Sequence, residues 1–184
     1  MRASAEEKTR LVDEFVRLCE IESPSRSERA IADYVRGELE ALGLEVREDS
    51  SASETRASSG NLLTRVDGPP GARKVLLCAH LDTVPLAAPV DVVRHDEVLT
   101  NANEAIVGAD NKAAVAVILA VARHLSTAST PVGLEILFTT CEELALAGAK
   151  AFDVDALESE FGFVFDHASP IGELIVAAPT FYLV

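Results

Sequence analysis

The sequence predicts an α/β fold, built as a sandwich of helices on a mixed, mainly parallel sheet. Segments with helical periodicity alternate along the chain with short apolar runs of strand length. The runs at residues 75–79 and 134–140 are continuously apolar, as expected of strands covered on both faces. A length of 184 residues suits one sizeable core but is short for two, so we expect a single domain.

The first part of the chain has the pattern of two helices. Apolar side chains recur over residues 6–20 at the spacing of one helical face. Residues 21–24 interrupt this pattern, and Ser25 and Glu28 then have the spacing of a capping box that starts a second helix. Gly43 is expected to end that helix.

Strands and loops alternate through the middle of the chain. We expect strands at residues 44–47, 61–66 and 75–79, a Ser- and Ala-rich loop at 50–60, and a Gly-Pro-Pro-Gly turn at 68–71. A long turn region is expected over residues 91–103. The segment 113–125 is apolar on nearly all sides, which predicts a buried helix.

The last part of the chain continues this alternation. We expect strands at residues 134–140, 161–165 and 174–177, and a helix at 144–152.

Composition and charge exclude several classes of protein. The net charge of -14 opposes binding to nucleic acid and to anionic membranes, and no apolar run approaches the ~20 residues of a membrane span. The N-terminus lacks the apolar region of a secretory signal, so we expect a cytoplasmic protein. Cys19, Cys78 and Cys141 are unclustered and lie in apolar runs, which predicts reduced, buried thiols rather than disulfides or a thiolate zinc site.

Acidic side chains and one imidazole follow the predicted strands at their carboxyl ends, where the sites of open α/β sheets collect. One more acidic residue precedes the predicted buried helix. These candidates are His80, Asp82, Asp110, Glu142, Glu143 and Asp166. One imidazole with several carboxylates is a donor set for a pair of divalent cations, with zinc, cobalt and manganese favoured.

Each candidate also has a purely structural explanation. Asp110 has the position of a helix N-cap, and Glu142 and Glu143 could complement a helix dipole. His80, Asp82 and Asp166 could be ordinary hydrogen-bonding residues in turns after strands. Their combination favours a metal centre, and the remaining alternative of another class is an oxygen-rich calcium or magnesium site in a binding protein.

Four motifs together resemble the M20-type metallopeptidases, most closely the peptidase T-like branch. The motifs are AHLDTVP at residues 79–85, GADNK at 108–112, CEE at 141–143 and FD at 165–166, in the order and approximate spacing of that family. Shorter likenesses extend from residues 21–25 to residues 178–180. The resemblance implies a three-layer α/β/α sandwich of the zinc-peptidase type.

The resemblance also implies a role for each candidate residue. His80, Asp110 and Asp166 would bind one zinc, and Asp110 would bridge to a second zinc held by Glu143. Asp82 would accept a hydrogen bond from the other ring nitrogen of His80 and fix its tautomer. Glu142 would be the general base, which takes a proton from the water between the two metals and returns it to the leaving amine.

The sequence departs from the family in its length. Members of that family carry a further His ligand and a lid domain in a chain about twice as long, and neither lies within these 184 residues. We therefore expect residues 1–184 to be one segment of a catalytic domain. His124 lies too far along its predicted helix to replace the missing ligand. His167 is adjacent to Asp166 but is expected to point to the opposite face.

The expected function is zinc-dependent hydrolysis of a peptide or amide bond in a small substrate. The resemblance favours an aminopeptidase acting on short peptides. The alternatives are a deacylase or carboxypeptidase acting on N-acyl amino acids, and a metal-binding fragment that is inactive because it lacks the final His. Self-association of the segment is expected through exposed strand edges, with no nucleic-acid or membrane partner.

Overall fold

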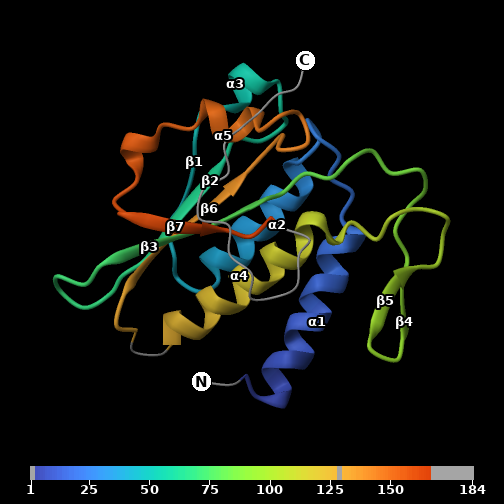
Figure 1. The fold of residues 1–184 in the computed structure, drawn as a ribbon, viewed down its shortest axis with the longest axis horizontal. Helices are drawn as coiled ribbons and strands as arrows, with labels where there is room; N and C mark the ends of the chain where they lie inside the picture. Colours follow the sequence, from blue (N-terminus) through green and yellow to red (C-terminus); the bar gives the residue numbers. More distant parts are fainter. Residues whose placement is uncertain (1–2, 128–129, 167–184) are drawn as a thin grey trace.

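The computed structural model describes residues 3–127 and 130–166, and its central feature is a five-stranded sheet (Figure 1). The strands, in spatial order, are β1 (Val46–Glu48), β2 (Leu62–Val66), β6 (Gly133–Thr139), β3 (Lys74–His80) and β7 (Phe161–Val164). β3 is parallel to both of its neighbours, whereas β2 is antiparallel to both β1 and β6. The predicted α/β fold with a mixed sheet is therefore confirmed, but the described strands form two parallel and two antiparallel pairs, so the sheet is not mainly parallel as expected.

Three helices pack side by side against one face of this sheet: α1 (Ala5–Glu20), α2 (Arg29–Glu40) and α4 (Ala109–Thr127) (Figure 1). α1 begins at a reciprocal capping box, in which Ser4 and Glu7 each accept a hydrogen bond from the other's backbone N–H. Beyond α2, Gly43 adopts a φ of +80°, which costs a residue without a side chain little.

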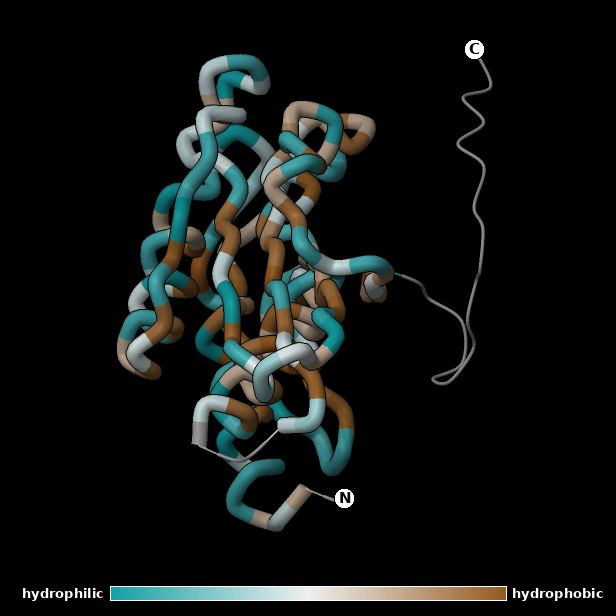
Figure 2. The backbone as a smooth tube through the Cα atoms, turned by 90° about the vertical axis from the view of Figure 1, so that its left-hand side faces the viewer, coloured by the Kyte–Doolittle hydropathy of each residue, from teal (hydrophilic) through white to brown (hydrophobic). Residues whose placement is uncertain are grey.

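The main core lies between these helices and the sheet. α2 and α4 bury branched aliphatic side chains against the inner face of β6, a strand that is buried along its whole length. Among the fully buried residues are Leu18, Ile31, Leu39, Ile118, Leu119, Ile136 and Phe138. Figure 2 shows that hydrophobic residues concentrate along the strands, while many turns are hydrophilic.

The opposite face of the sheet carries a smaller apolar cluster. Leu63, Cys78 and Leu137 are buried there, with Phe152 and Leu157 packed against them. Phe152 follows the short helix α5 (Ala147–Ala151), and Leu157 follows a 3-10 turn, η1 (Val154–Ala156). Helical segments thus flank both faces of the sheet, but the cover on this face is thin.

The structure corrects several expectations about individual elements. The expected loop at residues 50–60 contains a one-turn helix, α3 (Ala52–Thr55), and the expected turn region at 91–103 forms a hairpin of β4 (Val92–His95) and β5 (Val98–Asn101). In Figure 1 this hairpin stands to one side of the helices. The strand expected at 174–177 lies outside the described residues.

The expected start of the helix at residues 144–152 was also wrong. α5 begins only at Ala147, because Ala145 and Leu146 adopt φ values of +59° and +61°, which a continuous helix does not contain.

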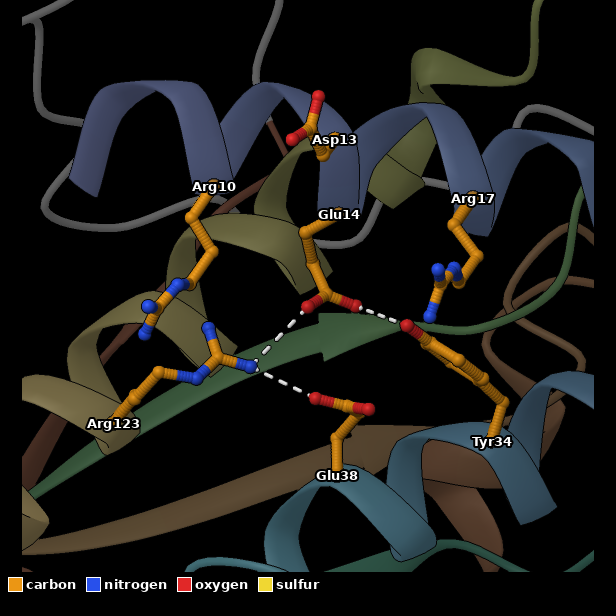
Figure 3. Close-up of a pocket in the computed structure, with 7 residues that line it drawn as sticks. All are labelled: Arg10, Asp13, Glu14, Arg17, Tyr34, Glu38 and Arg123. Carbon is orange, nitrogen blue, oxygen red and sulfur yellow. Dashed lines mark hydrogen bonds and ion pairs between the residues drawn. The ribbon is translucent and has the colours of Figure 1, made fainter. Parts of the chain in front are cut away.

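A network of charged side chains joins α1, α2 and α4 at their polar margin (Figure 3). The carboxylate of Glu14 accepts hydrogen bonds from Tyr34 at 2.7 Å and from Arg123 at 3.2 Å, and Arg123 also donates to Glu38 at 2.8 Å. Burial, reinforced by the Glu14 carboxylate, raises the pKa of Tyr34 to about 12. This network surrounds a cavity of about 300 Å³ and balances its own charges, so we interpret it as an interhelical contact.

All three cysteines are buried and unpaired, as expected. Within the described residues, every helix falls short of the length or apolarity needed to cross a lipid bilayer.

Candidate metal centre

Strand order brings the candidate residues to one edge of the sheet. β3 lies between β6 and β7 and runs parallel to both, so the carboxyl ends of the three strands are neighbours. His80, the last residue of β3, pairs with Thr139 at the end of β6. Glu142, Glu143 and Asp166 follow the ends of the two flanking strands, and therefore lie on either side of His80.

His80 is the centre of this arrangement. Its imidazole is almost fully buried, with Nε2 3.1 Å from Asp110 Oδ1 and 3.7 Å from Asp166 Oδ1. On the other side of the ring, Nδ1 lies 3.4 Å from Asp82 Oδ1. Burial acts to lower the pKa of His80, but the nearby carboxylates of Asp166 and Asp82 outweigh it and raise this pKa to about 11.

Asp82 supports the residues around it rather than facing solvent. Its buried carboxylate accepts hydrogen bonds from Ser25 Oγ at 2.7 Å and from the backbone N–H groups of Glu142 at 2.8 Å and Glu143 at 3.2 Å. Burial opposes the charge of Asp82, but the proximity of His80 and the hydrogen bonds from Ser25 and Glu142 lower its pKa. Asp82 is therefore an anion that lies beside the imidazole and holds the turn after β6.

Asp110 comes to His80 from the amino end of α4. Gly108 precedes it with a φ of +78°, and Asp110 and Asn111 have non-helical backbone angles, so the regular helix begins only after them. The side chain of Asp110 remains 74% exposed while its Oδ1 contacts the buried imidazole. Asp110 thus combines access to solvent with a contact to the buried imidazole.

Glu142 and Glu143 lie in the turn that follows β6. Burial raises the pKa of both carboxyl groups; nearby His80 opposes this, and neighbouring acidic groups add to it. A carboxylate with a raised pKa is a better proton acceptor near neutral pH than an ordinary one.

Burial also raises the pKa of Cys141 to about 12, with a contribution from Glu28, so the thiol is protonated and does not act as a nucleophile at neutral pH.

The side chains form two groups whose ligand atoms lie close enough together to hold a cation. His80, Asp110 and Asp166 present ligand atoms within 4.8 Å of one another, and so do His80, Glu142 and Glu143. The first group has the composition expected for one metal; in the second, Glu143 is joined by Glu142 rather than by Asp110. The negative charge of the surrounding carboxylates, which favours a proton on His80, also favours a metal cation beside it. The imidazole nitrogen and the carboxylate oxygens fit divalent metals that accept both kinds of ligand.

Two supporting residues were missed in the sequence. Ser25 and Glu28 do not form the predicted capping box: Glu28 is itself the N-cap residue of α2, and its side chain makes no cap hydrogen bond. Ser25 donates to Asp82, and Glu28 accepts hydrogen bonds from the backbone N–H and the thiol of Cys141. Only the spacing of the two residues signalled a role, and that spacing suggested a different partner.

Of the two other histidines considered as ligands, the structure describes only His124, which does not reach this site. His124 lies near the far end of α4, with Nδ1 3.2 Å from Glu7 of α1. His167 lies outside the described residues.

The model of peptidase family M28 matches residues 61–168. A peptidase T-like protein of Rhizobium meliloti is 29% identical over 209 residues, which cover 90% of this chain and 49% of that protein. Among solved structures, the aminopeptidase PepT of Bacillus cereus matches with a TM-score of 0.87 and 29% identity, over 92% of this chain and 46% of that one. A tripeptidase of Staphylococcus aureus matches with a TM-score of 0.82 and 29% identity, over 88% and 44%.

These comparisons confirm the peptidase T-like resemblance and the zinc-peptidase type of fold. The matching family model is that of M28, whereas the motifs had suggested M20. The chain spans about half the length or less of the curated relatives that it matches.

Proposed function

Because this chain belongs to peptidase family M28, we propose that it carries the metal-binding part of an enzyme that hydrolyses peptide or amide bonds in short peptides. The observation that supports this proposal most directly is the convergence of four carboxylates on the buried imidazole of His80. The names of the related tripeptidase and aminopeptidase favour release of N-terminal residues from short peptides.

The ligand assignment is the one that the resemblance to the metallopeptidases implies, and the grouping of His80, Asp110 and Asp166 at the sheet edge supports its first part. His80, Asp110 and Asp166 would hold one divalent cation, and Glu143 would hold a second, with Asp110 as the bridge. Zinc is the favoured metal, with cobalt and manganese as alternatives. When bound, the cations would polarise the scissile carbonyl and increase the acidity of the attacking water.

Glu142 is the residue we assign to proton transfer. Its carboxylate would take a proton from water as the water attacks the carbonyl carbon, and would then give that proton to the leaving amine. Asp82 would keep the proton of His80 on Nδ1, so that Nε2 offers its lone pair on the side of Asp110 and Asp166. It would also hold the Glu142 amide, which fixes the position of the base.

We also propose that residues 1–184 form only part of the catalytic domain. The relatives are about twice as long, and among the described residues no strand pairs with the outer side of β7. Hydrolysis of N-acyl amino acids by a deacylase or carboxypeptidase remains the alternative activity. An inactive metal-binding unit is the alternative of another class.

The test uses Glu142→Gln, with Glu104→Gln as a matched control in an exposed part of the chain. We expect the Glu142 variant to bind the same amount of zinc as the unaltered chain, because the proposed ligands are intact. We expect its turnover of di- and tripeptides to fall by about 10²- to 10⁴-fold, because the proton acceptor is lost. Zinc content and hydrolysis of a peptide panel are measured side by side, and the Glu104 variant retains both.

Three outcomes would favour an alternative over the proposed function. Zinc binding with no hydrolysis by the unaltered chain would favour the inactive unit. Cleavage of N-acyl amino acids in preference to peptides would favour the deacylase. Tighter binding of calcium than of zinc would contradict the imidazole-containing site altogether.

A further inference from the structure

We propose that Glu28 is a positioning residue for the turn that carries Glu142 and Glu143, acting through Cys141. This inference rests on the proposed function of that turn. It assigns a role at the metal centre to the amino end of α2, which supplies no candidate ligand. The carboxylate lies at the point where the chain enters α2, and its partner is 113 residues further along.

The contacts of Glu28 all converge on one oxygen. Glu28 Oε1 accepts hydrogen bonds from the Arg26 backbone N–H at 2.8 Å, the Cys141 backbone N–H at 3.2 Å and the Cys141 thiol at 3.2 Å. Both Glu28 and Cys141 are completely buried. Hydrogen bonds shielded from water are stronger than those exposed to it, so Glu28 restrains Cys141 effectively.

Cys141 is the residue at which the chain leaves the line of β6. Its φ of +51° lies in the left-handed region, which is unfavourable for a residue with a side chain. Glu142 follows directly. The hydrogen bonds that Glu28 accepts from Cys141 therefore stabilise the backbone conformation that aims the two following carboxylates at His80.

The same turn is held from its other side by Asp82, which accepts the backbone N–H groups of Glu142 and Glu143. Two buried carboxylates thus hold three consecutive backbone amides of the turn. Ser25 belongs to the same segment as Glu28 and donates to Asp82, so residues 25–28 support both carboxylates that hold the turn.

A purely structural role for Glu28 is less satisfactory. Its side chain caps no helix, and its second oxygen, Oε2, has no hydrogen-bond partner among the described residues. A buried carboxylate with one unpartnered oxygen is costly, so burial of this group does not by itself stabilise the fold. Stabilisation of the turn at Cys141 explains why Glu28 makes its hydrogen bonds there.

The test compares Glu28→Leu and Glu28→Gln with Glu135→Leu. Glu135 is a matched control, because it is also a fully buried carboxylate that accepts backbone N–H groups, but from residues 158 and 159, far from the site. Amide hydrogen exchange is measured on each protein without metal, together with urea unfolding. Cobalt binding is then followed by titration of its absorption spectrum.

We expect Glu28→Leu to speed exchange at residues 141–143 at least 10-fold while residues 134–138 of β6 exchange as before. We expect one of two cobalt-binding steps to weaken by about 10- to 100-fold, and the other to change less than threefold. Glu28→Gln keeps an oxygen acceptor at the same place, so it rescues both measurements. Glu135→Leu leaves exchange at the turn and the ratio of the two cobalt affinities unchanged.

The proposal is overturned if Glu28→Leu leaves exchange at residues 141–143 unchanged. It is also overturned if both cobalt steps weaken in parallel with a loss of global stability, because that result indicates a structural role alone. If the unaltered chain binds no cobalt while the exchange result holds, then the proposed function fails and Glu28 remains the residue that orders this turn.

Discussion

Glu48, at the end of β1, connects this short strand to α2 and to the start of β2. Its carboxylate pairs with Arg29 and Arg36 of α2 and accepts the backbone N–H of Gly60. Burial acts to raise the pKa of Glu48, but the hydrogen bonds and charge of these partners outweigh it and lower the pKa to about 2. The carboxylate is therefore more strongly ionised in the folded chain than in the unfolded one.

The depressed pKa of Glu48 predicts a pH-dependent contribution to stability. Because the folded pKa lies below the unfolded value of 4.5, the contribution is present above pH 4.5 and is lost as the pH falls toward 2. We expect Glu48→Gln to lower the free energy of unfolding by about 2–3 kcal/mol at pH 7, with the difference from the unaltered chain shrinking below pH 4.5. Urea unfolding at several pH values measures this difference.

The neighbouring Glu45 provides the control for this experiment. It pairs with Arg47 on the exposed surface of the same strand region, where water screens the charges. Glu45→Gln is expected to change the free energy of unfolding at pH 7 by less than about 1 kcal/mol. An equal effect of both substitutions would show that the contribution comes from net charge rather than from the contacts of Glu48.

At the same scale, the sequence predicted which residues would gather but not what supports them. His80 and Asp166 were found because each follows an apolar strand, and the rule that sites lie at carboxyl ends of strands depends only on chain order. Ser25 and Glu28 were misassigned, because a Ser and a Glu at this spacing fit a local capping box. Their actual partners lie 57 and 113 residues away, a distance over which sequence spacing carries no information.

At the scale of elements, α5 approaches the end of β6 unusually closely through Gly148. A Cβ placed on Gly148 would lie 2.1 Å from the carbonyl oxygen of Thr140 and 2.8 Å from Asn61 Oδ1. Asn61 in turn donates to the Gly148 carbonyl and accepts the Thr140 amide. This contact joins the start of β2, the end of β6 and α5 immediately before the turn that carries Glu142.

Gly148→Ala is therefore expected to push α5 away from β6 and to lower the free energy of unfolding by about 1–3 kcal/mol. Gly37→Ala is the matched control, because Gly37 lies in the middle of α2 with no atom within 4 Å of its added Cβ. That substitution is expected to stabilise the chain by about 0.5–1 kcal/mol, through better helix propensity. Thermal and urea unfolding measure the expected loss of stability in Gly148→Ala and the expected gain in Gly37→Ala. An unchanged free energy of unfolding in Gly148→Ala would contradict the close contact.

Long elements were predictable from periodicity, and short ones were not. α1 and α4 repeat an apolar pattern over several turns, so their existence does not depend on distant contacts. The β4–β5 hairpin turns at Asp96, which has a φ of +55°, and lacks the Asn-Gly or Asp-Gly pair that usually signals such a turn. α3 is a single turn, too short to show periodicity.

At the scale of the whole molecule, the sheet is well covered on its helical face and poorly covered at β7. The four residues of β7 are all exposed, and Val164 is 70% accessible. β7 pairs with β3 on one side, and among the described strands none pairs with its outer side. An edge strand with exposed apolar side chains is a template for pairing with another chain.

Self-association of this chain is therefore expected to proceed through β7. Val164→Lys places a charge on the most exposed apolar position of this edge, so it is expected to shift the population toward monomer, as measured by sedimentation velocity across a range of concentrations. Val154→Lys is the control, since Val154 is similarly exposed but lies in the 3-10 turn rather than in the sheet. A chain that is already monomeric and fully soluble without substitution would contradict both the pairing at β7 and the proposal that further polypeptide normally covers this edge. The net charge of -14 makes copies of the chain repel one another, and salt screens this repulsion. If apolar strand pairing drives self-association, association should therefore become stronger in high salt. If attraction between charged patches drives it, association should become weaker.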